Sequence, residues 1–370
     1  MRPFFLQLFL LFSVATCAQD IYLLIGTYDS PKSEGIYLYR FNTGDGTATP
    51  LSHVKTANPS YLSVSPDKKM IYAVAENASN GKGGEVAAFR FDAESGTLQF
   101  INKQSTGGDH PCYVECDRTG NWIFAGNYTS GSVSVLKREP DGRLSSGVSV
   151  IPHRGSGPDT VRQKGPHVHC TYISPDNRHL FVPDLGTDKI WIYRFNEKTG
   201  QLTPGKQPYA GSDPGSGPRH FILHPGHKTG YLVEELSGTV VVYRNKNGRL
   251  KRIQRISTMP DGDASFPGSA DIHVSPDGRF LYASNRGTSN TIAVYRISKK
   301  GTLSLAGHQS TLGRGPRNFT LDPSGKWLLA GNQNSDEVVI FQRDAETGLL
   351  RDSGHRIAVG RPVCLKWVVR

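Results

Sequence analysis

One short turn recurs along the chain and divides it into copies of a single four-strand pattern. Three copies of the turn are nearly identical, Ser65-Pro66-Asp67, Ser174-Pro175-Asp176 and Ser275-Pro276-Asp277, and degenerate versions lie at 117–119, 224–226 and 322–324. The second residues of the turns fall at 66, 118, 175, 225, 276 and 323, so neighbouring copies are 47 to 57 residues apart. A period of this length, with four strands in each copy, is typical of a propeller blade.

The segments around each turn have the composition of β-strands. A short apolar run precedes the turn, as in 61–64, and a second follows it, as in 70–74. A third run is rich in β-branched and aromatic residues, as in 190–195, and a weak amphipathic run after a glycine completes the copy. Such runs, bounded by Gly, Asn, Asp and Pro, predict strands, and we find no convincing helical periodicity after residue 18.

The two ends of the chain supply complementary strands. Residues 21–28 match the second strand of a copy, and residues 362–369 match the first. Pairing these ends in one blade closes the ring at seven blades and removes an unpaired sheet edge that would invite aggregation. We therefore predict an all-β fold, with residues 19–370 forming a single seven-bladed β-propeller of four antiparallel strands per blade.

Residues 1–18 have the pattern of a signal peptide. Arg2 is their only charge, and an apolar run at 4–12 precedes the small residues at 15–18. We expect cleavage after Ala18 and export to the periplasm or the extracellular space. The segment Val14-Ala15-Thr16-Cys17 also resembles a lipoprotein box, so a lipid anchor at Cys17 is the alternative. No further apolar run is long enough to predict a membrane span.

The positive charge of the chain indicates that it binds an anionic small molecule. The formal net charge is +11, but lysines and arginines are scattered, without the basic tract or the aromatic-and-basic strand motif of a nucleic-acid-binding protein. Arginines that line a site for an anion explain the charge better. No Cys-x-x-Cys pair suggests zinc, and we predict no metal and no cofactor. Four cysteines on predicted strands are expected to be buried free thiols: Cys112, Cys116, Cys170 and Cys364.

Alignment of the copies shows where they differ. The column that starts the innermost strand lies six residues before the second residue of each turn. It is mostly small or apolar, with the exceptions His169, Arg219 and Arg317. The column at the end of the second strand contains Thr27, Glu76, Asn127, Asp184, Glu235, Asn285 and Asn332. Arg286 lies in the next column, directly after Asn285. All these columns are predicted to face one mouth of the central channel. A purely structural repeat does not need a histidine, arginines and carboxylates at its axis.

Five segments carry a recognisable pattern: Gly165–His169, Gly217–Phe221, Glu234–Ser237, Ser284–Arg286 and Gly315–Phe319. They resemble the lactonase family of seven-bladed propellers, and the resemblance covers essentially the whole mature chain. That family includes the propeller-type 6-phosphogluconolactonase and the fungal carboxymuconate lactonizing enzyme. Carried over by motif, its proposed catalytic residues are His169, Arg219, Glu235 and Arg286. The predicted signal peptide departs from the cytoplasmic phosphogluconolactonase.

The predicted function is hydrolysis of a small anionic lactone derived from a sugar. Glu235 or His169 would take a proton from water, and Arg219 and Arg286 would hold the oxyanion and an anionic group of the substrate. Residues expected to contact the substrate or support the site are Arg317, His220, His167 and Glu76. Two alternatives stay open: the same groups can close a lactone in the reverse direction, and an exported propeller can act as a non-catalytic binding platform. Each of these side chains also has a structural interpretation, such as a strand histidine or an ion pair between blades.

Overall fold

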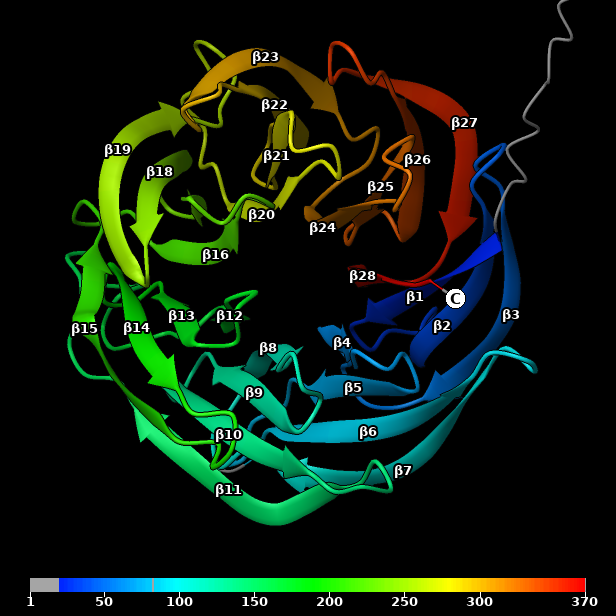
Figure 1. The fold of residues 1–370 in the computed structure, drawn as a ribbon. Helices are drawn as coiled ribbons and strands as arrows, with labels where there is room; N and C mark the ends of the chain where they lie inside the picture. The colour runs from blue at the N-terminus through cyan, green and yellow to red at the C-terminus, as the bar shows by residue number, and fades with distance from the viewer. Residues whose placement is uncertain (1–19, 82, 370) are drawn as a thin grey trace, which may run out of the picture.

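The computed structural model describes residues 20–81 and 83–369. The predicted signal peptide and Cys17 lie outside these residues. The described residues form seven four-stranded antiparallel sheets arranged in a ring around a central axis (Figure 1). No helix occurs in this part of the chain, and so none that could span a membrane. The prediction of an all-β, seven-bladed propeller is confirmed.

The blades are numbered 1 to 7 in the order of their innermost strands. The innermost strands are β4 (Leu62–Val64), β8 (Pro111–Cys116), β12 (Tyr172–Ile173), β16 (Pro218–Leu223), β20 (Ser269–Val274), β24 (Pro316–Leu321) and β28 (Pro362–Val368). The second strands are β5 (Met70–Ala75), β9 (Trp122–Asn127), β13 (His179–Asp184), β17 (Thr229–Glu234), β21 (Phe280–Asn285), β25 (Trp327–Asn332) and β1 (Asp20–Thr27).

The third and fourth strands complete each blade toward the rim. The third strands are β6 (Glu85–Asp92), β10 (Ser132–Arg138), β14 (Lys189–Phe195), β18 (Thr239–Lys246), β22 (Thr291–Ile297), β26 (Glu337–Arg343) and β2 (Gly35–Asn42). The outer strands are β7 (Thr97–Ser105), β11 (Leu144–Pro152), β15 (Leu202–Gly211), β19 (Arg249–Ser257), β23 (Leu303–Ser310), β27 (Leu350–Ala358) and β3 (Ala48–Lys55).

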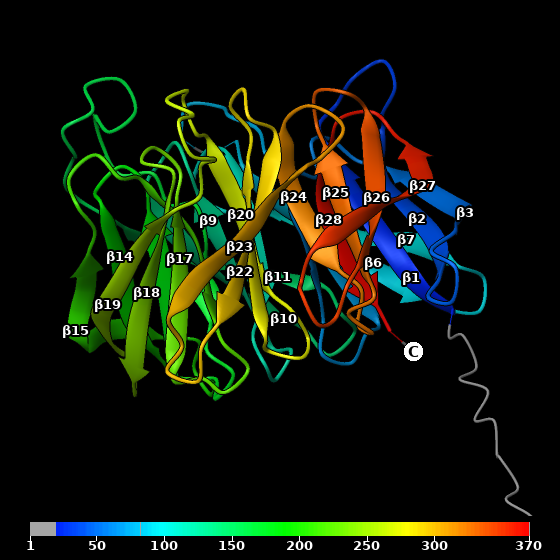
Figure 2. The same cartoon turned by 90° about the horizontal axis from the view of Figure 1, so that it is seen from above.

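Blade 7 closes the ring with strands from both ends of the chain, in the order β28-β1-β2-β3. The two terminal strands pair antiparallel, with Tyr22 opposite Val368 and Ile25 opposite Leu365. The predicted closure is therefore confirmed. In the side view β28 ends toward the bottom of the ring, and the connection between β11 and β12 rises at the top (Figure 2). We call the two ends of the channel the upper mouth and the lower mouth, as they lie in that view.

The recurring turn is held by its own side chains. Ser65 Oγ donates to Asp67 and accepts a hydrogen bond from the Met70 amide, and the two other Ser-Pro-Asp turns repeat this arrangement. In a degenerate copy, the carboxylate of Asp117 replaces the serine and accepts from the Trp122 amide at 2.9 Å. The turn keeps one geometry because each blade must reverse direction at the same level of the ring.

Buried aromatic residues join neighbouring blades. The Tyr231 hydroxyl donates to the carbonyl of Gly301 in the next blade, and the Tyr282 hydroxyl donates to Gly348 in the blade after that. Trp122 Nε1 donates to the carbonyl of Glu197 across another blade boundary. A buried tyrosine or tryptophan needs such a partner for its polar atom, so these bonds fix how one sheet packs on the next. The four cysteines of the described chain are buried free thiols, as predicted.

The start of the innermost strand carries a β-bulge in several blades. The pairing shifts register between Pro111 and Tyr113, between Pro218 and His220 and between Pro316 and Asn318. A bulge bends the strand and re-aims the side chain of the extra residue. The extra residues here are Cys112, Arg219 and Arg317. The bulges thus turn members of the aligned column toward the upper mouth.

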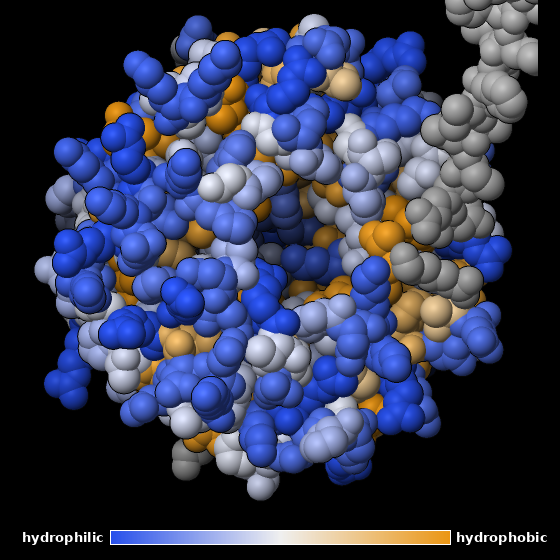
Figure 3. Space-filling model, in the orientation of Figure 1, coloured by the Kyte–Doolittle hydropathy of each residue, from blue (hydrophilic) through white to orange (hydrophobic). Residues whose placement is uncertain are grey.

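The opposite face of the ring is hollowed at its centre. Figure 3 looks onto the lower mouth and shows hydrophilic residues inside this hollow. The channel between the two mouths is filled by buried side chains of the innermost strands, including Tyr113, His220 and Asp271, and by Tyr61, which directly precedes β4. The two mouths are therefore separate environments.

Candidate active site

Glu235 is the centre of a cluster of arginines at the upper mouth. Its Oε2 accepts from Arg219 Nε at 2.9 Å and lies 3.0 Å from Arg286 Nη2. Its Oε1 accepts from Arg162 Nη2 at 2.7 Å. Arg219 comes from the bulge of β16, Arg286 follows β21, and Arg162 lies in the long connection between β11 and β12. Three guanidinium groups from separate parts of the chain thus converge on one carboxylate.

The charges around Glu235 keep it ionised. Burial by itself would raise its pKa, but Arg286, Arg219 and Arg162 outweigh burial and lower the pKa to about 2. Both carboxylate oxygens are also occupied by guanidinium groups. Glu235 is consequently a weak proton acceptor in this arrangement. It is well placed to hold the arginines in fixed positions.

Arg219 is held in place by a second carboxylate, that of Asp271, which acts through His220. Only 1% of Arg219 is exposed, and its Nη1 contacts His220 Nε2 at 3.3 Å and donates to the carbonyl of Ala270. Nδ1 of His220 donates to Asp271 Oδ1 at 2.8 Å. Burial, reinforced by the charge of Arg219, lowers the pKa of His220 to about 4, so the ring is neutral at neutral pH. Because a guanidinium only donates, Nε2 of His220 must be the acceptor.

His169 lies beside this cluster as a neutral imidazole. Its ring is 5.3 Å from that of His220 and 5.5 Å from that of Tyr128, measured between centroids. Burial, with smaller contributions from Arg219 and other cations, holds its pKa well below the usual value. Nδ1 lies 3.7 Å from Cys112 Sγ, and no protein hydrogen bond to Nε2 is present in residues 20–81 and 83–369. The ring is thus in the protonation state of a base.

His167 supports the site through Tyr128. The two rings stack with centroids 4.4 Å apart, and His167 Nδ1 donates to the Tyr128 carbonyl at 2.9 Å. The Tyr128 hydroxyl accepts from Arg162 Nη2 at 3.2 Å. Tyr128 therefore contacts both histidines, stacked on His167 and edge-on to His169. Within the described residues no group of three His, Cys, Asp or Glu side chains is arranged to hold a metal ion.

Arg317 reaches the upper mouth without a carboxylate partner. Its guanidinium carbon lies 5.3 Å from the ring centre of Tyr28, whose hydroxyl donates to Glu76 Oε2 at 2.7 Å. In the described part of the chain, Arg317 forms no ion pair with a carboxylate, whereas Arg162, Arg219 and Arg286 all pair with Glu235. Burial would lower the pKa of Arg317, but Tyr28 and Glu76 reverse the effect and raise it. Arg317 is a permanent positive charge that is available to an anion.

The structure brings the four predicted catalytic residues to one mouth and corrects part of the alignment. Glu234, not Glu235, ends β17 opposite Thr239, as Asn127, Asp184 and Asn285 end their strands. Glu234 is fully buried and accepts from Ser237 and Thr239 within its own blade. Glu235 and Glu76 belong one position later, in the column of Tyr28, Tyr128 and Arg286. A one-residue shift moves a side chain to the other face of a strand, so this correction separates structural carboxylates from those at the channel.

Arg162 is the site residue that the repeat did not reveal. It lies in an insertion outside the four-strand pattern, and the only trace of the insertion is the 57-residue spacing between the turns at 118 and 175. Its neighbour Gln163 anchors the insertion by donating to the carbonyl of Leu185 and to Asp188, each at 2.8 Å. The insertion therefore presents Arg162 to Glu235 from a fixed position.

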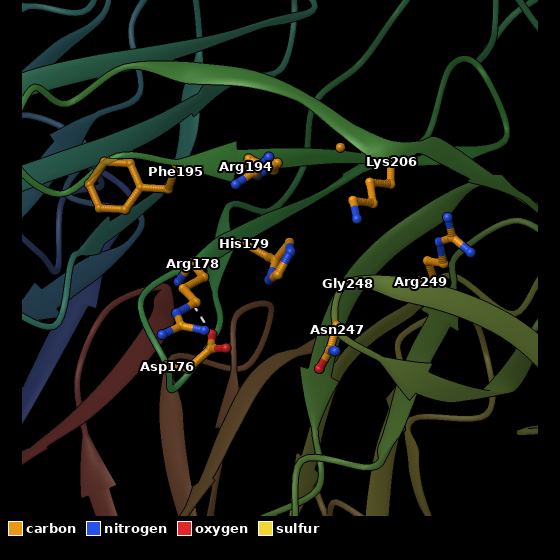
Figure 4. Close-up of a pocket in the computed structure, with 10 residues that line it drawn as sticks. Asp176, Arg178, His179, Arg194, Phe195, Lys206, Asn247, Gly248 and Arg249 are labelled. Atoms are coloured by element: carbon orange, nitrogen blue, oxygen red, sulfur yellow. Dashed lines mark hydrogen bonds between the residues drawn. The ribbon is translucent and has the colours of Figure 1, made fainter.

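A separate basic cleft of about 500 Å³ lies at the rim between blades 3 and 4 (Figure 4). Arg178, His179, Arg194 and Lys206 surround it, and Asp176 is the one carboxylate among its lining residues. Oδ1 of Asp176 accepts from the hydroxyl of Ser174 and from the Arg178 amide. The cleft contains none of the predicted site residues. The arrangement at the upper mouth, with a neutral imidazole beside fixed guanidinium groups, is the better candidate for chemistry.

Comparison with known proteins agrees with this geometry. The sequence profile of the family described as "Lactonase, 7-bladed beta-propeller" matches residues 22–367. The chain belongs to the lactonase family of seven-bladed β-propellers. A protein of Formosa agariphila named 6-phosphogluconolactonase is 39% identical over 305 residues, 81% of this chain and 86% of the relative. The Bacillus subtilis protein of the same name is 37% identical over 303 residues, 80% of this chain and 84% of the relative.

A solved structure is also closely similar to this chain. The periplasmic gluconolactonase PpgL of Pseudomonas aeruginosa superposes with a TM-score of 0.90 and 38% identity. The match covers 95% of this chain and 99% of that structure. The resemblance found in the sequence is therefore confirmed at the level of family and fold. The individual roles of the residues at the upper mouth remain predictions.

Proposed function

We propose that this lactonase hydrolyses a small sugar-derived lactone at the upper mouth, with water as the nucleophile. The observation that carries the proposal is the neutral His169 next to guanidinium groups that Glu235 holds in place. A neutral imidazole can accept a proton from water, and fixed positive charge can stabilise the oxyanion that forms as the carbonyl is attacked. The names of the relatives, 6-phosphogluconolactonase and gluconolactonase, support a sugar lactone as the substrate class.

His169 is the proposed general base, and Glu235 positions the arginines. For Nε2 of His169 to accept a proton, Nδ1 must carry one, which it donates toward Cys112 Sγ. The Cys112 thiol in turn lies 3.6 Å from the carbonyl of Val168, to which it donates. Burial raises the pKa of Cys112, so the thiol keeps its proton. Burial and, to a smaller extent, the nearby cations depress the pKa of His169, and an anionic substrate would offset part of that positive charge and strengthen the base.

The arginines are proposed to have two different roles, substrate binding and positioning of other side chains in the site. Arg219 is buried under Glu235 and is a positioning residue. Arg286 and Arg317 are partly exposed and are proposed to bind the lactone carbonyl and an anionic group on the substrate. A guanidinium stays charged at any working pH and offers a planar pair of donors to an oxyanion, a carboxylate or a phosphate. Glu76 would orient Arg317 through Tyr28.

Export is the proposed destination of the mature enzyme. The single charge, apolar run and small residues of 1–18 favour a signal peptide, and a gluconolactonase from a periplasm is among the similar structures. The domain would then extend from residue 19 to residue 370. A substrate in that compartment need not be phosphorylated. Mass measurement of the mature N-terminus after expression of the full chain would distinguish cleavage after Ala18 from lipidation at Cys17.

The reaction is tested by following acid release from lactones with a pH indicator. Glucono-1,5-lactone and its 6-phosphate would be compared with the uncatalysed rate, because both also hydrolyse spontaneously. We expect acceleration by the wild-type protein and a loss of roughly 10²–10⁴ in kcat in His169→Gln, the usual contribution of a general base. Glu235→Gln should also lower kcat, but this variant should keep an acid limb in its pH–rate profile, because the limb reports the titration of His169.

Two results would contradict the assignment. A wild-type protein that accelerates neither lactone would favour a binding platform over an enzyme. A fully active His169→Gln variant, with an acid limb that disappears only in Glu235→Gln, would make Glu235 the base. Thermal unfolding of each variant would separate a catalytic loss from a loss of fold.

A further inference from the structure

The lower mouth of the channel contains a second cavity. Its volume is about 340 Å³, at the small end of the range for small-molecule sites. Tyr61, Tyr113, His220 and Asp271 form its inner end, and the same His220 contacts Arg219 on the upper side. One layer of side chains thus separates this cavity from the candidate active site. The hollow is visible at the centre of Figure 3.

The wall of this cavity is built from one level of the innermost strands. The residues three positions after the aligned column line it in six blades: Ser63, Glu115, Tyr172, Ile222, His273 and Lys366. Almost every blade contributes a different polar side chain at this level. A wall that only packed a repeat would have no need for such variety, and the same argument identified the upper mouth.

Lys366 is a cation of the cavity wall that has no carboxylate of the described chain within ion-pair distance. Its Nζ donates to the Tyr61 hydroxyl at 3.3 Å and lies 4.4 Å from the centre of that ring. Among the described residues, no carboxylate forms an ion pair with this amine. Arg118, which also lines the cavity, is paired with Glu115 at 3.1 Å, and Asp271 accepts hydrogen bonds from His220 and His273. The amine of Lys366 is therefore the cation that a ligand's carboxylate can reach without displacing a carboxylate of the protein.

The rest of the lining suits a ligand with hydroxyl groups. Glu115 offers a carboxylate, and His273, of which 24% of the side chain is exposed, offers an imidazole. Both exchange hydrogen bonds with alcohols. The rings of Tyr61 and Tyr113 stack 4.0 Å apart and add aromatic surface next to these polar groups. A few polar groups on an aromatic lining are typical of a small-molecule site.

We propose that the lower mouth binds a hydroxylated carboxylate of monosaccharide size, with the carboxylate on Lys366 and hydroxyls on Glu115 and His273. The ligand class follows from the lining of this cavity and does not depend on the reaction proposed at the upper mouth. The two sites share His220 and Asp271 as a common wall, yet each has its own unpaired cation, Arg317 above and Lys366 below.

Titration calorimetry with D-gluconate tests this site, and sorbitol is the matched ligand without the carboxylate. We expect wild-type protein to bind gluconate more tightly than sorbitol. Lys366→Met should weaken the lower-mouth binding at least tenfold, Lys366→Arg should restore it, and Arg317→Met should leave it in place. Gluconate binding that is no tighter than sorbitol, or that is lost in Arg317→Met and kept in Lys366→Met, would overturn the proposal.

A second measurement uses the wild-type chain and so does not depend on how the variants fold. Acetylation of lysines with an amine-reactive ester is followed by peptide mass spectrometry with and without gluconate. Gluconate should protect Lys366 and leave the Lys206 amine at the rim unprotected; equal labelling of Lys366 in both samples would contradict the site. Neither measurement includes a hydrolysis step, so a failure of the proposed reaction would not change its result.

Discussion

Arg162 donates to Glu235 across 73 positions of sequence, with Nη2 and Oε1 2.7 Å apart at the upper mouth. The pair ties the insertion between β11 and β12 to the end of β17, and the same guanidinium also reaches Tyr128. Arg162 is partly exposed, whereas Glu235 is buried. This contact makes a residue outside the repeat part of the candidate site. It also fixes the third guanidinium that keeps Glu235 ionised.

We predict that Arg162→Met weakens the use of anionic lactones. The pair is partly exposed, so its loss should cost about 1 kcal/mol, roughly a fivefold rise in KM. Neutral lactones should be affected less, because the missing group is a positive charge. Initial rates on phosphorylated and unphosphorylated lactones measure the difference. Arg154→Met is the matched control, since Arg154 is exposed in the same connection; an equal effect of both changes would argue against a contact at the site.

Arg317→Met should have a larger effect, because Arg317 is the cation at the upper mouth proposed to take the substrate's anionic group. A charged hydrogen bond contributes about 2 kcal/mol, so kcat/KM for an anionic lactone should fall roughly thirtyfold. Arg361 lies near the same Tyr28 ring, at 5.2 Å, but donates to the carbonyl of Asp29. Arg361→Met should therefore leave kcat/KM close to wild type. The reverse order of effects would move the anion site away from Arg317.

Acid should destabilise the propeller through His220. Its pKa is about 4 in the folded chain, because of burial and Arg219, and near 6.5 when unfolded. Below pH 6.5 the unfolded chain binds the extra proton, so the free energy of unfolding falls as the pH drops toward 4, by about 3 kcal/mol from this group. Urea unfolding between about pH 7 and pH 4 should show a shallower decline in His220→Gln than in wild type.

The exposed His227 provides the control for this pH dependence. It has a positive φ of 59°, a conformation that asparagine accepts, so His227→Asn should keep the wild-type decline. A His220→Gln variant with the full wild-type decline would show that another group carries the pH dependence.

Deletion of residues 361–370 should open the ring. It removes β28, the inner strand of blade 7, and exposes the edge of β1 from Tyr22 to Thr27. An unpaired, apolar edge strand is a template for association between chains. Size-exclusion chromatography should show aggregates or a failure to fold. A monodisperse, folded protein of this length would mean that the terminal strand is not needed for closure.

The architecture could be predicted from the sequence alone because most blades are formed by residues that are close to one another in the chain. The turn at Ser65-Pro66-Asp67 and the apolar runs on both sides of it recur with one period, and each blade buries its faces only against neighbouring copies. The matching ends at 21–28 and 362–369 then determined the number of blades. The column of His169, Arg219 and Arg317 was also visible in the sequence, since a charged residue at a crowded axis stands out from small ones.

Only the tertiary structure decided the register at the ends of the second strands and the partners of the side chains at the upper mouth. Glu234 and Glu235 are adjacent and chemically identical, and the backbone turn after β17 sends the first into its own blade and the second to the channel. Arg162 entered the site through an insertion that no repeat predicts, and Asp271 fixes Arg219 through His220 from another blade. Sequence patterns report the local periodicity of a strand. Contacts across the axis exist only after the ring has closed, because closure brings together residues that are distant in sequence.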